Sequence, residues 1–220
     1  MRILLSYSLS EKSPLYPGTP PVRISPGRSI AKGDTANTHE ICASTHAGTH
    51  IDVPFHFCPE GRTVQDCLLS ENLISHVLMV DIPPGTTAVT PEALAVARKF
   101  PAAEGVLVRT GMCRIRKADP VAYIRDYPGV DDSVPDFLRQ ACPKIRFFGI
   151  DTISVSSPRN KETGRSCHRK FLCKNPEILI LEDLDLTYPD LGSRPFSMTV
   201  YPLILAPVDG TPVMVFAELP

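Results

Sequence analysis

Four side chains of types that commonly bind metal ions lie within one short segment of the sequence. His46, His50, Asp52 and His56 fall within the eleven-residue stretch HAGTHIDVPFH. Neutral imidazole and carboxylate groups are typical ligands of Zn²⁺, Mn²⁺ or Fe²⁺. A lone histidine is more often an ordinary core or surface residue, but four ligand-type groups this close together predict a metal site.

The spacing of these groups favours a turn followed by a short strand. A helix would put His46 and His50 on one face, but Gly48, Pro54 and three β-branched residues argue against a helix. Side chains alternate along a strand, so His50 and Asp52 point to the same side. Gly48 allows a turn that brings His46 round to them. We therefore expect these three groups to converge on one cation, with the histidine after Pro54 close by.

The chemistry that such a site supports is hydrolysis. A bound divalent cation lowers the pKa of water toward neutrality and polarises a carbonyl group. Amide cleavage also needs a proton on the leaving nitrogen, which a histidine can supply near neutral pH. His56 lies outside the first trio and suits that acid/base role. The alternative is that His56 is a ligand of a second metal ion.

The elements that must position this segment resemble those of an α/β domain. Short apolar runs rich in β-branched residues predict strands at 2–6, 77–82, 105–110, 145–150, 178–181 and 200–206. Helical patterns follow at 90–100, 119–127 and 133–141. Alternating strands and short helices indicate an α/β fold, and the length suits one domain spanning 1–220. Two long segments, 13–33 and 154–175, are expected to be functional loops.

Composition excludes several other classes of protein. Proline contributes 23 of 220 residues, which rules out a long-helix bundle, while 43% apolar residues suffice for a core. The net charge of −1 argues against a nucleic-acid partner, and no apolar run is long enough to span a membrane. The seven cysteines contain no Cys-x-x-Cys pair, so reduced thiols in a cytoplasmic protein are expected.

Two further features leave alternatives open. Segment 159–174 holds six basic residues and one acidic residue. A solvated loop is the favoured interpretation, and the alternative is that Arg165 or Arg169 steers a substrate carboxylate. Asp151, at a predicted strand end, suits either a helix cap or a hydrogen bond that orients a metal-binding histidine.

The segment 46–56 also carries a family resemblance. Its pattern, His-x-Gly-Thr-His-x-Asp-x-Pro-x-His, resembles the signature of the metal-dependent cyclase-like hydrolases, which include bacterial kynurenine formamidases and isatin hydrolases. The resemblance extends over most of the chain. It includes the segments 9–10, 14–20, 108–111, 149–154, 168–169, 181–184 and 209–213.

This resemblance implies a fold and a set of residue roles. The fold would be a swivelling β/β/α domain, an α/β arrangement with a barrel-like mixed sheet and short helices, assembled as a dimer or larger oligomer. One metal ion would be bound by His46, His50 and Asp52. Asp52 would bridge to a second ion completed by His168 and Glu182, with Zn²⁺ or Mn²⁺ as the metal and one or two ions per chain. The resemblance also assigns His56 as the proton donor and acceptor and places Tyr16 against the substrate.

The leading hypothesis is thus a metal-dependent hydrolase that cleaves a C–N amide bond of a small formamide, aryl amide or lactam. Within the same family, a lactone hydrolase or a cyclase/dehydratase is an alternative. A non-catalytic metal- or small-molecule-binding protein on the same scaffold is the alternative from another class. The partners expected are a small-molecule substrate and further copies of the chain.

Overall fold

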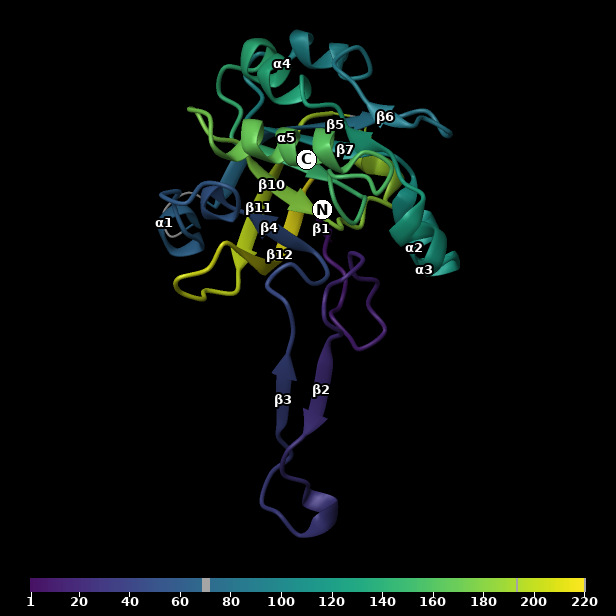
Figure 1. Cartoon of the computed structure of the whole chain (residues 1–220), viewed down its shortest axis with the longest axis vertical. Helices are drawn as coiled ribbons and strands as arrows, with labels where there is room; N and C mark the ends of the chain where they lie inside the picture. The colour runs from purple at the N-terminus through teal and green to yellow at the C-terminus, as the bar shows by residue number, and fades with distance from the viewer. Residues whose placement is uncertain (69–71, 193, 220) are drawn as a thin grey trace.

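Seven strands close into a barrel at the centre of the molecule (Figure 1). The computed structural model describes residues 1–68, 72–192 and 194–219. The strands follow the order β12-β11-β5-β7-β9-β10-β4, and β4 pairs back with β12 to complete the ring. Their bounds are β4 His50–Asp52, β5 Leu73–Asp81, β7 Gly105–Arg109, β9 Phe147–Ile150, β10 Leu179–Glu182, β11 Phe196–Pro202 and β12 Gly210–Glu218.

The barrel sheet is mixed. Strands β5, β7, β9 and β10 run parallel to one another, and the other pairings are antiparallel. Strand β1 (Arg2–Leu4) adds to the outer edge of β12. This pairing brings the two ends of the chain together, because the Met1 amino group donates to the Leu219 carbonyl at 2.7 Å.

Two of the short helices described, α4 (Val134–Ala141) and α5 (Lys161–Leu172), cover one side of the barrel, and two apolar clusters separate its inside from its outside. The helices are α1 Val64–Leu68, α2 Met112–Ala118, α3 Pro120–Arg125, α4 Val134–Ala141 and α5 Lys161–Leu172. Single 3₁₀ turns are η1 Ile30–Lys32, η2 Pro54–His56, η3 Ala95–Lys99 and η4 Pro189–Gly192, and a small separate ladder joins β6 Ala88–Val89 to β8 Gly129–Val130. Side chains alternate between the clusters: Leu107 of β7 belongs to the inner cluster, whereas Val106 and Val108 pack outward with residues of α4 and α5.

The structure confirms the expected α/β class with a barrel-like mixed sheet and short helices. The runs at 77–82, 105–110, 145–150 and 178–181 all fall on barrel strands, and 119–127 and 133–141 contain α3 and α4. The strand predicted at 200–206 is only partly confirmed. Strand β11 ends at Pro202, and Leu203 and Ile204 beyond it are more than half exposed.

Two segments differ from the sequence prediction. Segment 90–100 is not an α-helix but a set of turns ending in η3, in which the buried Leu94 and Ala97 are three residues apart. A spacing of three suits the tighter 3₁₀ turn. Segment 154–175 is not a loop, because it contains α5, the longest helix described. Its many charged residues conceal an apolar stripe that includes Cys167, Phe171 and Leu172.

The expected loop at 13–33 forms part of a projecting arm. Strand β2 (Arg23–Pro26) pairs with β3 (His39–Cys42) in an antiparallel ribbon that extends away from the barrel (Figure 1). Most of the ribbon is exposed, including the apolar side chain of Ile41. In the described part of the chain, no helix is both long and apolar enough to cross a lipid bilayer.

The expectation that all cysteines are reduced thiols is wrong for one pair. Cys58 and Cys173 form a disulfide across 115 residues of sequence. Cys58 follows η2, and Cys173 follows the last residue of α5. Sequence spacing could not reveal this pair, because only the folded chain brings the two elements together. The free cysteines are Cys42, Cys67, Cys113, Cys142 and Cys167.

We expect this disulfide to contribute substantially to stability. A crosslink that closes a loop of this length restricts the unfolded chain and typically stabilises a protein by about 2–4 kcal/mol. The double variant Cys58→Ser/Cys173→Ser should therefore lose about that much free energy of unfolding in urea titrations. Cys42→Ser, which changes an exposed free thiol, is the matched control. Equal stability of the double variant and the control would contradict the prediction.

Candidate active site

The centre of the candidate site is the antiparallel pairing of β4 with β10. This register sets His50 directly opposite Glu182 and Asp52 opposite Ile180. Directly opposed residues share one face of a sheet, and Ile180 belongs to the outer apolar cluster. The three polar side chains therefore lie on the helix-covered face of the barrel. All three are buried, with at most 3% exposure.

The turn before β4 orients its first histidine. Gly48 has φ = 70°, a left-handed conformation that suits glycine. Its carbonyl accepts a hydrogen bond from Nδ1 of His50 at 2.8 Å. The other ring nitrogen, Nε2, is thereby directed between Asp52 and Glu182, at 3.3 and 3.4 Å from their nearest carboxylate oxygens. The predicted turn and short strand are thus confirmed.

His46 reaches the same place from the turn. Its Nδ1 lies 2.9 Å from Asp52 Oδ1, and its Nε2 lies 2.9 Å from Asp209 Oδ2. Burial alone would lower the pKa of His46, but the hydrogen bonds to Asp209 and Asp52 outweigh burial and raise the pKa to about 9. The ring fits because Gly210 has no side chain: a Cβ there would lie 2.5 Å from His46 Cε1.

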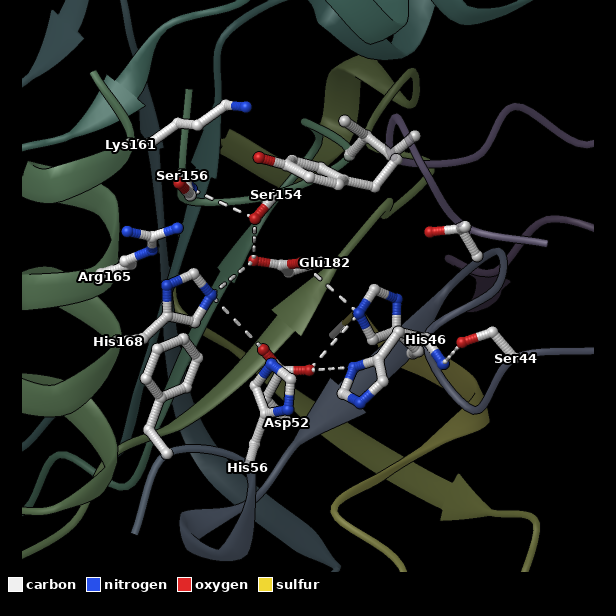
Figure 2. A pocket seen from close by; sticks show the side chains of 15 residues that line it. Ser44, His46, Asp52, His56, Ser154, Ser156, Lys161, Arg165, His168 and Glu182 are labelled. Carbon is white, nitrogen blue, oxygen red and sulfur yellow. Dashed lines mark hydrogen bonds and ion pairs between the residues drawn. The ribbon is translucent and has the colours of Figure 1, made fainter. Parts of the chain in front are cut away.

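Helix α5 contributes the fourth group, His168. Its Nδ1 donates to the Gly164 carbonyl one turn earlier at 2.7 Å. This bond directs Nε2 toward the two carboxylates, 3.6 Å from both Asp52 Oδ2 and Glu182 Oε1. Phe57 stacks on the imidazole, with ring centroids 4.7 Å apart and planes 17° from parallel. A strand, a turn and a helix therefore converge on one pair of carboxylates (Figure 2).

This donor set fits a divalent metal. Among the described residues, three groups of ligand atoms each lie within 4.8 Å of one another: His46/His50/Asp52, Asp52/His168/Glu182 and His46/His56/Asp209. The first two groups share Asp52. Burial would raise the pKa of both carboxylates, yet hydrogen bonds from the histidines hold the pKa of Asp52 well below its usual range and lower that of Glu182. Two adjacent buried carboxylates need a compensating positive charge, which protonated histidines or a cation can provide.

Asp209 is a residue of the site that our sequence interpretation did not assign. His56 Nδ1 donates to Asp209 Oδ2 at 2.8 Å, and the same oxygen contacts His46. Hydrogen bonds from His46 and His56 hold the pKa of Asp209 far below its usual range. Asp209 begins the segment 209–213, so the family resemblance contained the signal. The strand register pairs the next residue, Gly210, with Asp52, and this pairing brings Asp209 close to the histidines.

A cavity of about 410 Å³ opens over these groups. It is lined by all seven residues singled out from the sequence, which are Tyr16, His46, His50, Asp52, His56, His168 and Glu182. Ser44, Ser154 and Ser156 add hydroxyl groups, and Lys161 and Arg165 add two cations (Figure 2). The structure therefore brings together every predicted site residue, although they come from distant parts of the chain.

Support for Glu182 comes from its neighbours on both sides. The Ser154 hydroxyl and the Val155 amide donate to Glu182 Oε1 at 3.1 and 2.7 Å. The next residue, Asp183, has φ = 55°. Its buried carboxylate accepts two hydrogen bonds from Arg116 at 2.6 and 2.7 Å. These contacts keep the end of β10 in the conformation that directs Glu182 into the cavity.

The structure gives the positions of the three residues for which the sequence left alternatives open. Asp151 serves as a cap, because its carboxylate accepts hydrogen bonds from Thr110, Gly111 and Cys113 where α2 begins. Arg165 lines the cavity. Arg169 is exposed on the same helix and is absent from the cavity lining.

Comparison with known proteins places this geometry in a family. The Cyclase family model, described as "Putative cyclase", matches residues 3–157. The chain belongs to this cyclase family. Its relatives include a protein named kynurenine formamidase from Geobacillus thermodenitrificans, which is 30% identical over 213 residues, covering 95% of this chain and 93% of that protein. A second relative named kynurenine formamidase, from Bordetella avium, is 29% identical over 210 residues, and the chain is accordingly a hydrolase of the cyclase family.

Solved structures of similar fold cover the whole chain. Isatin hydrolase A from Labrenzia aggregata bound to benzyl benzoate aligns with a TM-score of 0.79 at 20% identity, covering 99% of this chain and 93% of that one. An isatin hydrolase bound to the product analogue thioisatinate aligns with a TM-score of 0.83 at 17% identity, covering 100% and 92%. The barrel with short helices is thus a fold that this chain shares with these isatin hydrolases.

Within this cyclase-family fold, we expect Gly164 to control the distance between α5 and the carboxylates. A Cβ at this position would lie 2.6 Å from the Cα of Ser156. Gly164→Ala should therefore push the helix outward, move His168 away from Asp52, and lower the free energy of unfolding by about 1–3 kcal/mol. The measurements are thermal unfolding and metal content per chain by mass spectrometry. Thr163→Ala is the matched control, and unchanged metal content and melting in Gly164→Ala would contradict the prediction.

Proposed function

We propose that this protein is a metal-dependent hydrolase that cleaves the C–N amide bond of a small formamide, aryl amide or lactam. The observation that carries the proposal is the convergence of Asp52 and Glu182 with three imidazoles beside the His56–Asp209 pair. The names of the relatives, kynurenine formamidase and isatin hydrolase, support this class of substrate.

The proposed ligands form two sets that share one carboxylate. His46, His50 and Asp52 would hold one ion, and Asp52 with His168 and Glu182 would hold a second. Imidazole and carboxylate ligands suit Zn²⁺ and Mn²⁺. When bound, the divalent cation supplies Lewis acidity, which lowers the pKa of water and polarises an amide carbonyl.

His56 is the proposed acid/base residue. Its Nδ1–H donates to Asp209, which fixes the orientation of the ring and leaves Nε2 for proton transfer. Nε2 would accept a proton from the attacking water and return it to the leaving nitrogen, so that the amine departs neutral. A protein that only binds a metal has no need of such a histidine–carboxylate pair, which argues against the non-catalytic alternative.

Replacing the proposed ligands and the acid/base residue should have separable effects. We expect His50→Ala and Asp52→Ala to abolish both metal content and hydrolysis. His56→Ala should keep most of the metal and lose about 10²- to 10⁴-fold in kcat. The measurements are metal analysis and turnover of N-formylkynurenine, isatin and a simple lactone.

The same assays distinguish the alternatives. Lactone turnover without amide turnover would favour the lactone hydrolase of the same family. Full activity of metal-stripped His50→Ala would falsify the proposal, and bound metal without turnover of any of these substrates would favour a binding protein.

We also propose that residues 1–220 form one domain that assembles as a homodimer or tetramer through the β2–β3 arm. An isolated two-stranded ribbon is marginally stable in water. Ile24 lies directly opposite Ile41 on one face of this ribbon, and Ile41 is 64% exposed. A second copy of the chain would cover this apolar face.

Light scattering after size-exclusion chromatography tests the assembly. Ile41→Asp should shift the protein toward the monomer, because it puts a charge on the apolar face of the ribbon. Ser25→Asp is the matched control, since Ser25 pairs with Glu40 on the opposite face. An identical mass for all three proteins would exclude this interface.

A further inference from the structure

One wall of the cavity carries positive charge that the proposed amide chemistry does not use. Lys161, Arg165 and His168 all line the cavity and all come from α5. Their spacing of four and then three residues puts them on one face of the helix. Both cationic side chains extend into the pocket on the side of His168, near Ser156 (Figure 2).

These cations are available to a ligand. No hydrogen bond or ion pair of the Lys161 ammonium group is found among the described residues. Arg165 pairs with Glu162 on the same helix at 2.6 Å, but the two side chains are 56% and 79% exposed. Exposed ion pairs of this kind contribute little to stability, so a ligand carboxylate can replace Glu162 at low cost.

The carboxylates at the bottom of the cavity do not need these cations. Asp52 contacts His46, His50 and His168. Glu182 contacts two of the same histidines and accepts hydrogen bonds from Ser154 and a backbone amide. Lys161 and Arg165 therefore add positive charge to the open part of the cavity, where a substrate would enter.

We propose that Lys161 and Arg165 form an anion subsite and that the substrate is a small amide bearing a carboxylate. This inference rests on the proposed amide hydrolase. The guanidinium group can bind a carboxylate through two parallel hydrogen bonds. Measured along the helix axis, the backbone of Arg165 lies about 4.5 Å and that of Lys161 about 10 Å from the backbone of His168. The ligand carboxylate would therefore lie against the α5 wall, to one side of the carboxylates at the bottom of the cavity.

The same cavity offers apolar surface that suits an aromatic group. Tyr16, Phe57 and Ile153 line it, and Tyr16 packs on the cluster that contains Ile153. A benzene ring that carries a short acidic side chain would place its apolar face on these residues and its carboxylate toward the α5 wall. A neutral lactam without an acidic group leaves the cationic wall unused.

A binding experiment tests the subsite without turnover. Phenylacetate and its neutral isostere phenylacetamide are titrated into the metal-loaded protein by calorimetry. The double variant Lys161→Gln/Arg165→Gln should weaken phenylacetate binding about 10- to 100-fold and leave phenylacetamide unchanged. Arg169→Gln removes one positive charge from the same helix outside the cavity and should bind phenylacetate within about twofold of the wild type. Equal phenylacetate affinity in the double variant and the wild type overturns the subsite, as does an absence of phenylacetate binding to the wild type.

A turnover experiment separates the subsite from the reaction. We compare 4-formamidophenylacetate with its methyl ester, which has the same formamide and no charge. The wild type should prefer the acid, and the double variant should lose that preference because its KM for the acid rises. Glu162→Gln, which releases Arg165, should lower KM for the acid. Equal hydrolysis of acid and ester by the wild type overturns the subsite while the hydrolase stands. Turnover of neither compound, with charge-dependent phenylacetate binding intact, overturns the hydrolase and leaves the anion site.

Discussion

The burial of two carboxylates side by side is the constraint on which the rest of the site depends. Asp52 and Glu182 are almost inaccessible to solvent, and two such charges are tolerated only with matching positive charge within contact distance. Three elements supply it: the turn before β4, the first residue of β4, and the inward face of α5. Their positions are in turn set by the closed sheet, because β4 is held on one edge by β10 and on the other by β12.

Closure of the barrel therefore has a direct functional consequence. Pairing with β10 sets Glu182 opposite His50, and pairing with β12 sets Gly210 opposite Asp52. The second pairing also delivers Asp209, which joins His46 to His56 through one oxygen. A shift of one residue in either register would move these side chains to the opposite face of the sheet. The disulfide crosslinks the chain close to the same site, since Cys58 and Cys173 follow the elements that carry His56 and His168.

The polarity of the cavity follows from the same arrangement. Its base is acidic and becomes neutral when protonated histidines or cations balance it, whereas the α5 wall stays basic. A substrate that spans both regions must offer a polarisable carbonyl to the base and an acidic group to the wall. The proposed anion subsite favours an acidic amide over a neutral lactam, although the solved structures of similar fold include isatin hydrolases.

The sequence by itself determined the side-chain types of the proposed metal site, the short β4 strand and the α/β class, because residue chemistry and strand alternation are local properties. Resemblance to the family added His168, Glu182 and Tyr16. Segment 154–175 was misjudged because its charged residues hid the buried stripe of α5. Only the tertiary structure decided which distant groups meet: Asp209 with His56, Cys58 with Cys173, and Lys161 and Arg165 with the cavity. These contacts depend on strand register and helix packing across more than a hundred residues, which no local pattern encodes.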